Sequence, residues 1–376
     1  MKIGILTLPL HTNYGGILQA YALKTFLEKM GHEVHLIDTN FKKKSPWRII
    51  KDTIKNLIKK NPKEIENNKI NRLKHQSYLT FTKPFIEKNI KNITKTFTNP
   101  KTMGKEIKKY NFDAYIVGSD QIWNPKYFKH IEIAFFSFIS TGNPLRISYA
   151  PSFGSDSWKY SPEKEKICSE LIRKFDAISV RENSAVKLCE NHLGVEADWV
   201  LDPTMLLLPT EYAQLLTGKK TLAKKGNLFT YILDKAEDKT KIINAVSETF
   251  KLQAYELDSV ESKLPIPLEW STKATVEEWI ENFHKAEFIV TDSFHGTVFS
   301  ILFNKPFFAV INFKRGATRF ESLLKAFDLS DRLLGSFEEL TESKLKNTID
   351  WTSVNQILDQ KRKESYSFLF ESLNKR

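Results

Sequence analysis

Four short apolar segments in the first half of the chain each run directly into polar or glycine residues. The segments are FDAYIV, LRISYA, FDAISV and ADWVL, and the residues that follow them are Gly118–Asp120, Ser152–Gly154, Arg181–Glu182 and Asp202–Thr204. Short apolar segments that alternate with helical stretches are typical of a parallel sheet with crossover helices. Ligands of such sheets bind outside the carboxyl ends of the strands. The four polar ends therefore predict one common binding crevice.

The same alternation of strands and helices runs through most of the chain. A strand is predicted over Lys2–Leu8, and apolar residues with a helical period follow it until Gly31. A second series begins near Gly226, and Thr275 with Glu278 three residues later indicates a capped helix start. A chain of 376 residues is longer than one hydrophobic core usually serves. We therefore expect two α/β domains.

The domain boundaries follow from changes in this pattern. We expect an N-terminal domain over 1–207, a linker over 208–225, a C-terminal domain over 226–354 and a charged C-terminal helix over 355–376. Apolar residues on one side of that last helix predict that it packs back on the first domain.

The net charge of +12 is concentrated in one segment. Between Lys42 and Lys109 there are 20 basic and 5 acidic residues. We interpret about 42–110 as a basic helical insertion, with helices near Pro46–Lys60 and Lys63–Tyr78. The segment is either a solvated surface or a patch that contacts an anionic membrane or an anionic, lipid-carried substrate. The concentration of charge, and the lack of any known nucleic-acid-binding motif, argue against a nucleic-acid partner.

Other features restrict the compartment and the chemistry. The sequence has no run of about 18 apolar residues that could span a bilayer, and its start is predicted to be a strand and not a signal peptide. Cys168 and Cys189 belong to no CxxC or Cys/His cluster. We therefore expect a protein of the reducing cytoplasm without a metal site, whose contact with the inner face of the membrane would be peripheral.

The stretch TDSFHGTVFSILFNKPF, Thr291–Phe307, is the strongest single candidate for a reactive site. It predicts a strand end at Asp292 and then a helix, capped by Ser293 or Asp292, that is buried on all sides. The free N–H groups and the dipole at such a helix start favour an anion. His295 is there placed to donate a proton or to pair with a phosphate or carboxylate. A local hydrogen bond is the alternative role for this histidine.

Several cations are predicted near the same sheet edge. Arg181 follows a strand directly and can fork onto a carboxylate or phosphate, although a surface pair with Glu182 is the alternative. Three further cations surround a glycine after the strand FFAVI, and they are Lys314, Arg315 and Arg319. The NYGG turn after the first strand resembles only half of a dinucleotide fingerprint, so a nicotinamide cofactor is not expected.

Six stretches, in this order, resemble the bacterial polysaccharide pyruvyl transferase family. They are NYGGILQAYAL, YIVGSDQIWNP, ISYAPSFG, ISVRENS, VLDPTMLL and VTDSFHGTVFSILFNKPF. The resemblance implies two Rossmann-like domains facing a cleft, similar to B-type glycosyltransferases. It implies transfer of pyruvate from phosphoenolpyruvate, the only co-substrate expected, onto two hydroxyls of one sugar as a cyclic ketal, with release of phosphate. The implied acceptors are bacterial cell-surface saccharides, often lipid-linked.

The resemblance also implies roles for single residues. The active-site histidine of the family falls on His295, and the arginine after its SV strand falls on Arg181. Ser293 stands where some members have an arginine, so a cation of the 314–319 group is expected to supply that charge. The residues expected to bind phosphoenolpyruvate are Arg181, Ser293, His295, Gly296, Lys314, Arg315 and Arg319. Those expected to contact the acceptor sugar are Asn13, Tyr14, Gly15, Asp120, Gln121 and Asp202.

Two other functions fit the same sequence. A glycosyltransferase that uses a sugar nucleotide would have the same architecture, because a fold does not determine a function. A non-catalytic saccharide-binding protein would use the basic insertion. The acceptor sugar, the bridged hydroxyl pair and the oligomeric state are not specified by the sequence.

Overall fold

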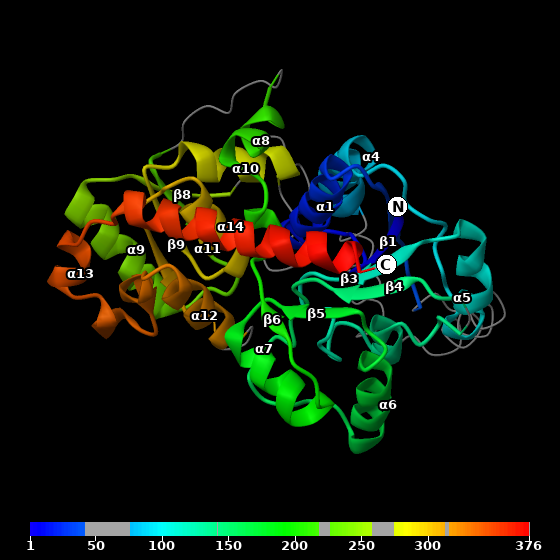
Figure 1. Cartoon of the computed structure of the whole chain (residues 1–376). Helices are drawn as coiled ribbons and strands as arrows, with labels where there is room; N and C mark the ends of the chain where they lie inside the picture. The colour runs from blue at the N-terminus through cyan, green and yellow to red at the C-terminus, as the bar shows by residue number, and fades with distance from the viewer. Residues whose placement is uncertain (42–75, 141, 218–225, 258–273, 313–315, 376) are drawn as a thin grey trace, which may run out of the picture.

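Two parallel β-sheets with helices on their faces make up the structure (Figure 1). The computed structural model describes residues 1–41, 76–140, 142–217, 226–257, 274–312 and 316–375. The predicted fold class, two α/β domains, is confirmed.

The first sheet, within the described residues, has six parallel strands in the order β2-β1-β3-β4-β5-β6. These are β1 Lys2–Leu6, β2 Glu33–Ile37, β3 Ala114–Val117, β4 Leu145–Ser148, β5 Ala177–Val180 and β6 Asp198–Trp199. Val117 of β3 pairs with Ser148 of β4, and Ser148 pairs with Ile178 of β5. The carboxyl ends of these strands therefore lie side by side, which brings the polar residues that follow them to one edge.

Helices cover both faces of this sheet, which explains why β3 is buried along its whole length. They include α1 Tyr14–Lys29, α4 Lys83–Asn89, α5 Pro100–Ile107, α6 Pro162–Ile172 and α7 Asn183–Leu188. Helix α1 begins earlier than the apolar period suggested, because the Asn13 side chain accepts a hydrogen bond from the Gly16 backbone N–H at 3.2 Å and caps it.

The second sheet has five described parallel strands in the order β11-β10-β9-β7-β8. These are β7 Leu228–Tyr231, β8 Ala254–Glu256, β9 Phe288–Thr291, β10 Phe307–Val310 and β11 Leu333–Leu334. The α-helices described in this domain are α9 Glu237–Phe250, α10 Val276–Lys285, α11 Phe294–Leu302, α12 Thr318–Ala326 and α13 Glu342–Lys346. Every residue of α11 is buried, as its apolar circumference predicts. The capping box of Thr275 and Glu278 is present at the start of α10.

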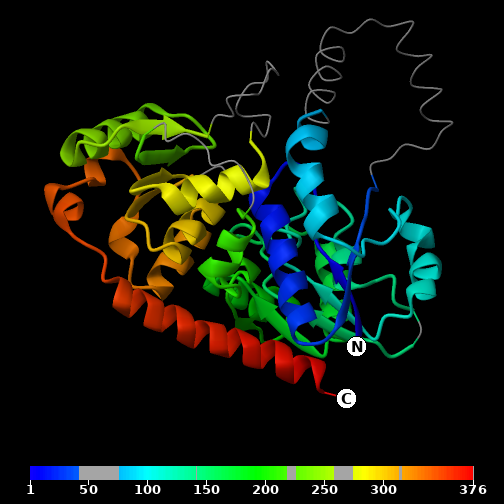
Figure 2. The same ribbon diagram turned by 90° about the horizontal axis from the view of Figure 1, so that it is seen from above.

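Helix α14, Trp351–Leu373, starts in the second domain and crosses to the first (Figures 1 and 2). It begins where the Asp350 side chain accepts hydrogen bonds from the backbone N–H groups of Thr352 and Ser353. Arg362 donates from Nε to the Met205 carbonyl at 2.7 Å and from Nη2 to the Leu207 carbonyl at 3.2 Å. The last helix thus packs on the segment that follows β6.

The basic segment is described only in part. The predicted helix over Pro46–Lys60 and most of the one over Lys63–Tyr78 lie outside the described residues. The described remainder contains α4 and α5 and runs beside β2, with bridges from Leu36 to Ile93 and from Thr39 to Phe97. The predicted linker over 208–225 begins with a short helix, α8 Pro209–Gln214. Among the described residues, no helix combines the length and the apolarity that crossing a bilayer requires.

Candidate active site

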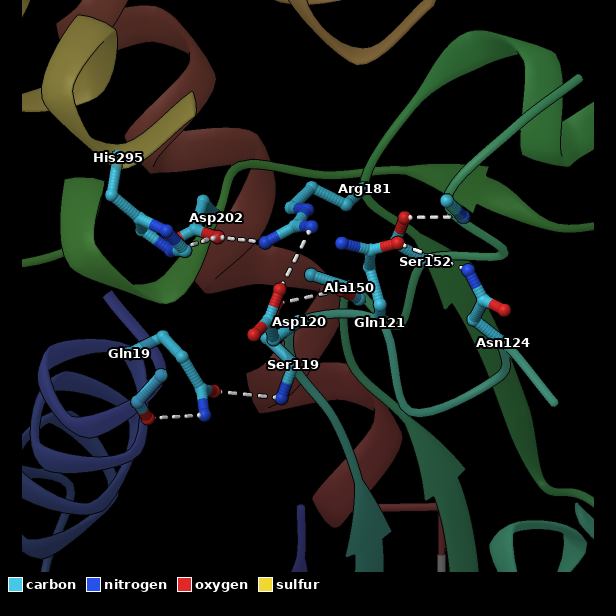
Figure 3. A network of polar contacts seen from close by, with 12 residues as sticks. Gln19, Ser119, Asp120, Gln121, Asn124, Ala150, Ser152, Arg181, Asp202 and His295 are labelled. Carbon is cyan, nitrogen blue, oxygen red and sulfur yellow. Dashed lines mark hydrogen bonds and ion pairs between the residues drawn. The ribbon is translucent and has the colours of Figure 1, made fainter. Parts of the chain in front are cut away.

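Arg181 is the centre of a buried charge cluster at the carboxyl end of β5 (Figure 3). Its Nη1 donates to Asp202 Oδ2 at 2.8 Å and its Nη2 to Asp120 Oδ1 at 3.3 Å, while Nε lies 3.8 Å from Glu182 Oε2. Burial alone would lower the pKa of Arg181, but the three carboxylates outweigh it and the pKa is raised. The guanidinium therefore stays charged, and it joins polar strand ends that lie far apart in the sequence.

Asp202 links this arginine to the second domain. Its Oδ1 accepts hydrogen bonds from the Thr204 N–H at 3.0 Å and the Thr204 hydroxyl at 2.7 Å, which fixes the carboxylate. Burial favours the protonated form of Asp202, but His295, Arg181 and Thr204 outweigh that effect and hold its pKa below the ordinary range. A carboxylate that stays ionised can accept a hydrogen bond from a neighbouring imidazole.

His295 lies in the first turn of α11 and points at Asp202 across the domain contact (Figure 3). Its Nε2 is buried and lies 3.5 Å from Asp202 Oδ2, an ion-pair distance. On its other side the ring lies against the start of α1, where a Cβ built on Gly15 would come within 2.0 Å of Nδ1. Position 15 therefore requires a glycine, because a side chain there would displace the His295 imidazole.

Two arginines converge on the Phe294 ring. The Arg181 guanidinium carbon lies 4.4 Å from the ring centroid and that of Arg319, on α12, lies 5.4 Å from it. Burial and, to a smaller extent, the charge of Arg181 lower the pKa of Arg319 to about 10, although Asp120 and Glu182 act in the opposite direction. The second domain thus contributes a cation as well as a histidine to the cluster.

The structure brings together Arg181, His295, Asp120, Asp202, Gly15 and Arg319 of the predicted site residues. Other predicted residues have local contacts. The Ser293 hydroxyl caps α11 by accepting from the Gly296 N–H at 3.3 Å, and a Cβ on Gly296 would lie 2.4 Å from Thr291 Oγ1. Lys314 and Arg315 lie outside the described residues.

The three remaining predicted sugar contacts serve the fold in this structure. Asn13 caps α1, and the Gln121 side chain accepts a hydrogen bond from Asn124 at 3.0 Å. The Tyr14 hydroxyl donates to the Ala274 carbonyl at 2.6 Å, which joins the two domains.

Glu182, expected at a strand end or as a surface partner of Arg181, is buried in the cluster, and Gln19 was not predicted there at all. Glu182 accepts a hydrogen bond from the Ser152 hydroxyl at 2.7 Å. Gln19 accepts one from the Ser119 N–H at 2.8 Å and donates to Thr7 at 2.9 Å, so it ties α1 to the loop that carries Asp120 (Figure 3). Its position as a lone amide inside the apolar run ILQAYAL was the signal that could have identified it.

Asp292, the alternative cap, supports the second domain instead. Its carboxylate accepts from the Leu233 N–H at 2.6 Å, from Lys239 Nζ at 2.6 Å and from Asn312 Nδ2 at 3.0 Å. This buried network fixes the end of β9 immediately before His295. No group of three or more potential metal ligands occurs in the described part of the chain.

Comparison with known proteins adds the family and the fold. The solved structures that match include the following two, each with a probability of 1.00. One is UDP-GlcNAc 2-epimerase from Neisseria meningitidis bound to UDP-GlcNAc. It superposes with a TM-score of 0.52 at 8% sequence identity, and the match covers 100% of each chain. MnaA of S. aureus with UDP has a TM-score of 0.51 at 12% identity, covering 100% of this chain and 97% of that one. At such identities the likeness shows the fold alone.

The sequence comparisons differ in outcome. No curated protein matches the chain. The family model described as polysaccharide pyruvyl transferase matches residues 13–313, which include every predicted site residue except Lys314, Arg315 and Arg319. Because that match extends over most of the 376 residues, the chain belongs to the polysaccharide pyruvyl transferase family.

Proposed function

We propose that this enzyme transfers pyruvate from phosphoenolpyruvate to two hydroxyls of one sugar in a bacterial cell-surface polysaccharide precursor. The observation that carries the proposal is the buried contact of His295 with Asp202 beside two arginines, at the point where the domains meet. Phosphoenolpyruvate has a carboxylate and a phosphate on three carbons, so a compact site with two guanidinium groups suits it.

His295 is the proton-handling group in this mechanism. His295, positioned by the Asp202 carboxylate, donates a proton to the methylene carbon, which leaves an oxocarbenium-like centre at the neighbouring carbon. One sugar hydroxyl attacks that centre, phosphate leaves, and the second hydroxyl closes the ketal. The two hydroxyl protons balance the one now in the methyl group and the one carried away on phosphate. Asp120 and Asp202 bind the reacting hydroxyls.

Arg319 provides the charge that some relatives have at position 293. Ser293 is occupied in capping α11, whereas Arg319 reaches Phe294 from α12. Arg181 binds both the substrate and the three carboxylates around it. The strength with which it binds phosphoenolpyruvate therefore depends on how those carboxylates are arranged. With this assignment the proposed phosphoenolpyruvate site has two cations, Arg181 and Arg319, although residue 293 is a serine.

The decisive experiment combines phosphoenolpyruvate with a panel of lipid-linked saccharides and measures phosphate release and product mass. His295→Asn should lower kcat by at least about a hundredfold, the usual contribution of a general acid. His130→Asn, which changes a histidine whose side chain is 41% exposed, is the matched control and should leave kcat unchanged. Normal turnover by a folded His295→Asn protein would refute the assignment.

The alternative donor, a sugar nucleotide, is tested in parallel. The structural neighbours named above include an epimerase bound to UDP-GlcNAc. We expect phosphoenolpyruvate to raise the melting temperature and UDP-GlcNAc to leave it unchanged, because ligands stabilise the state that binds them. The opposite pattern would favour a glycosyltransferase.

The basic segment is proposed to hold the enzyme near an anionic membrane that carries the lipid-linked acceptor. Its described part, residues 76–109, has 8 lysines and 2 acidic residues. Two of these lysines pair with the acids, Lys83 with Glu87 and Lys95 with Glu106, and the excess positive charge faces outward. Binding to vesicles with phosphatidylserine should be strong at low salt and weaken steeply at high salt. Salt-independent binding, or none, would contradict this role.

A further inference from the structure

Gln19 is a buried amide beside the loop that carries Asp120, and the mechanism above gives it no role (Figure 3). It is 0% exposed. Its amide nitrogen donates to the Thr7 hydroxyl at 2.9 Å and to the Gly16 carbonyl at 2.8 Å, and its amide oxygen accepts from the Ser119 N–H at 2.8 Å. Because the amide nitrogen and the amide oxygen are both bonded, turning the amide over would break these contacts, so the side chain is fixed in one orientation.

Ser119 is held by two members of this network, which fixes the residue that follows it. Its N–H donates to Gln19, and its carbonyl accepts from the Thr7 hydroxyl at 3.3 Å. Asp120 has a φ of 59°, in the left-handed region, which costs free energy for residues other than glycine and persists where the surrounding contacts hold it. The two bonds to Ser119 therefore stabilise the backbone from which the Asp120 carboxylate accepts a hydrogen bond from Arg181.

The bond from Gln19 to the Gly16 carbonyl lies in the first turn of α1. Gly16 follows Gly15, and the ring of His295 lies so close to Gly15 that a Cβ there would come within 2.0 Å of Nδ1. The Gln19 amide therefore joins the turn that supports the His295 ring to the loop that carries Asp120. Loss of this amide should displace both the proton-handling group and a carboxylate of the charge cluster.

We propose that Gln19 is a positioning residue, which holds the His295 ring in place relative to the Asp120 carboxylate. It acts through the backbone of α1 and of the loop before Asp120, and its hydrogen bonds within the described residues go to groups that take no part in the proposed reaction. Burial of an amide inside the apolar run ILQAYAL costs free energy unless its polar atoms are bonded, as they are here. An effect of Gln19 on turnover rests on the proposed function, whereas its effect on the His295 ring does not.

The first test needs no substrate and follows the His295 ring by NMR. In protein labelled at the ε1 carbon of its histidine rings, the His295 signal is the one that disappears in His295→Asn. Gln19→Met keeps the length of the side chain and loses its hydrogen bonds, so it should shift that signal. Gln253→Met, which changes an exposed glutamine of the second domain, is the control and should leave the signal in place. An unmoved His295 signal in folded Gln19→Met protein would overturn the proposal.

A second variant keeps the test decisive if Gln19→Met does not fold. Gln19→Glu retains an acceptor for the Ser119 N–H, but an ionised carboxylate cannot donate to the Gly16 carbonyl. It should therefore shift the His295 signal as well. A signal at the wild-type position in this variant would count against the proposal in the same way.

The second test is kinetic and compares single and double variants in the phosphate-release assay. Gln19→Met should lower kcat/KM by at least about tenfold, because small displacements of reacting groups are costly. In the double variant Gln19→Met/Gly15→Ala the combined loss should be smaller than the product of the two single losses by at least about threefold, since both act through the His295 ring. Gln253→Met/Gly15→Ala should show simple multiplication.

The two tests separate this proposal from the proposed function. Losses that multiply in Gln19→Met/Gly15→Ala would show that Gln19 does not act through the His295 ring. Absence of phosphate release by the wild type would count against the proposed function alone, and the NMR comparison would then still decide whether Gln19 positions His295.

Discussion

Gly15 and His295 define the site at the scale of single residues. The two belong to different domains, and the imidazole occupies the space in which a side chain at position 15 would lie. A glycine at a helix start is usually explained by its conformational freedom. Here the close approach of the histidine is the stronger reason.

We predict that Gly15→Ala lowers kcat/KM by at least about tenfold, because its methyl group displaces the His295 ring from Asp202. The fold should persist, since alanine favours helices. Gly16→Ala is the control: its Cβ would meet only the Asn13 side chain, at 3.3 Å or more. Equal rates for both variants in the phosphate-release assay would show that the histidine position is not critical.

Glu182 gives a prediction about pH. Burial raises its pKa above the ordinary value of 4.5, although Arg181 and Ser152 oppose the shift. A raised pKa in the folded state means that Glu182 stabilises the fold below about pH 4.5 and that this contribution is lost as the pH rises through the folded pKa. Glu182→Gln stays neutral, so its free energy of unfolding should rise relative to wild type as the pH increases from about 4.5 through the folded pKa of Glu182.

Urea unfolding at a series of pH values measures this difference. The slope should approach about 1.4 kcal/mol per pH unit between the unfolded and folded pKa values. Glu170→Gln, on an exposed part of α6, should show no such trend. A constant difference between Glu182→Gln and wild type across the range would contradict the raised pKa.

At the scale of elements, α14 holds the segment that carries Asp202. The Leu201 N–H donates to the Ser365 hydroxyl at 3.1 Å, and Arg362 binds the Met205 and Leu207 carbonyls. The helix therefore supports the charge cluster through backbone contacts on either side of Asp202.

Arg362→Ala should lower the free energy of unfolding by about 2 kcal/mol, because two carbonyls lose a charged donor. It should also reduce kcat through the shift of Asp202. Lys363→Ala, one residue further along α14 and exposed, should change stability by less than about 0.5 kcal/mol. Chemical denaturation of both variants checks the prediction, which fails if their stabilities agree.

The contacts of α14 also show which features of the fold could be predicted from the sequence and which could not. The strands, the buried helix α11 and the cap at Thr275 follow from local patterns of apolar and polar residues. Arg181 was expected at a strand end, and its position there is confirmed, but its carboxylate partners depend on strand order. The contact of Arg362 with Met205 joins residues 157 apart and has no local signal. Local chemistry thus identified the candidate residues, and long-range pairing determined their partners.

At the scale of the whole molecule, Tyr14 is a main contact between the domains. Its ring stacks on Trp279 of α10 at a centroid distance of 5.6 Å, and its hydroxyl donates to the Ala274 carbonyl. Burial raises the pKa of Tyr14 well above its ordinary value, so the hydroxyl remains a donor throughout the usual pH range.

Tyr14→Phe should keep the stacking and lose the hydrogen bond, at a cost of about 1 kcal/mol in the free energy of unfolding. Tyr14→Ala should cost at least about 3 kcal/mol, since a buried aromatic ring is also removed. Tyr366→Phe, which alters a tyrosine that is 44% exposed, is the control. Equal stability of Tyr14→Phe and wild type would show that the hydroxyl does not contribute to the domain contact.

The contacts of α14 with the first domain also affect the order in which the site forms during synthesis on the ribosome. Ser365 leaves the ribosome 164 residues after Leu201, a delay of roughly 8–30 s at bacterial or eukaryotic rates of synthesis. During that interval the six strands of the first sheet have been synthesised, and Asp202 already has Arg181 and Thr204 as partners, but its loop lacks the contacts that α14 makes with Leu201, Met205 and Leu207. The nascent first domain therefore lacks both His295 and the support of α14, and the site is complete only after the second domain and its last helix have been synthesised.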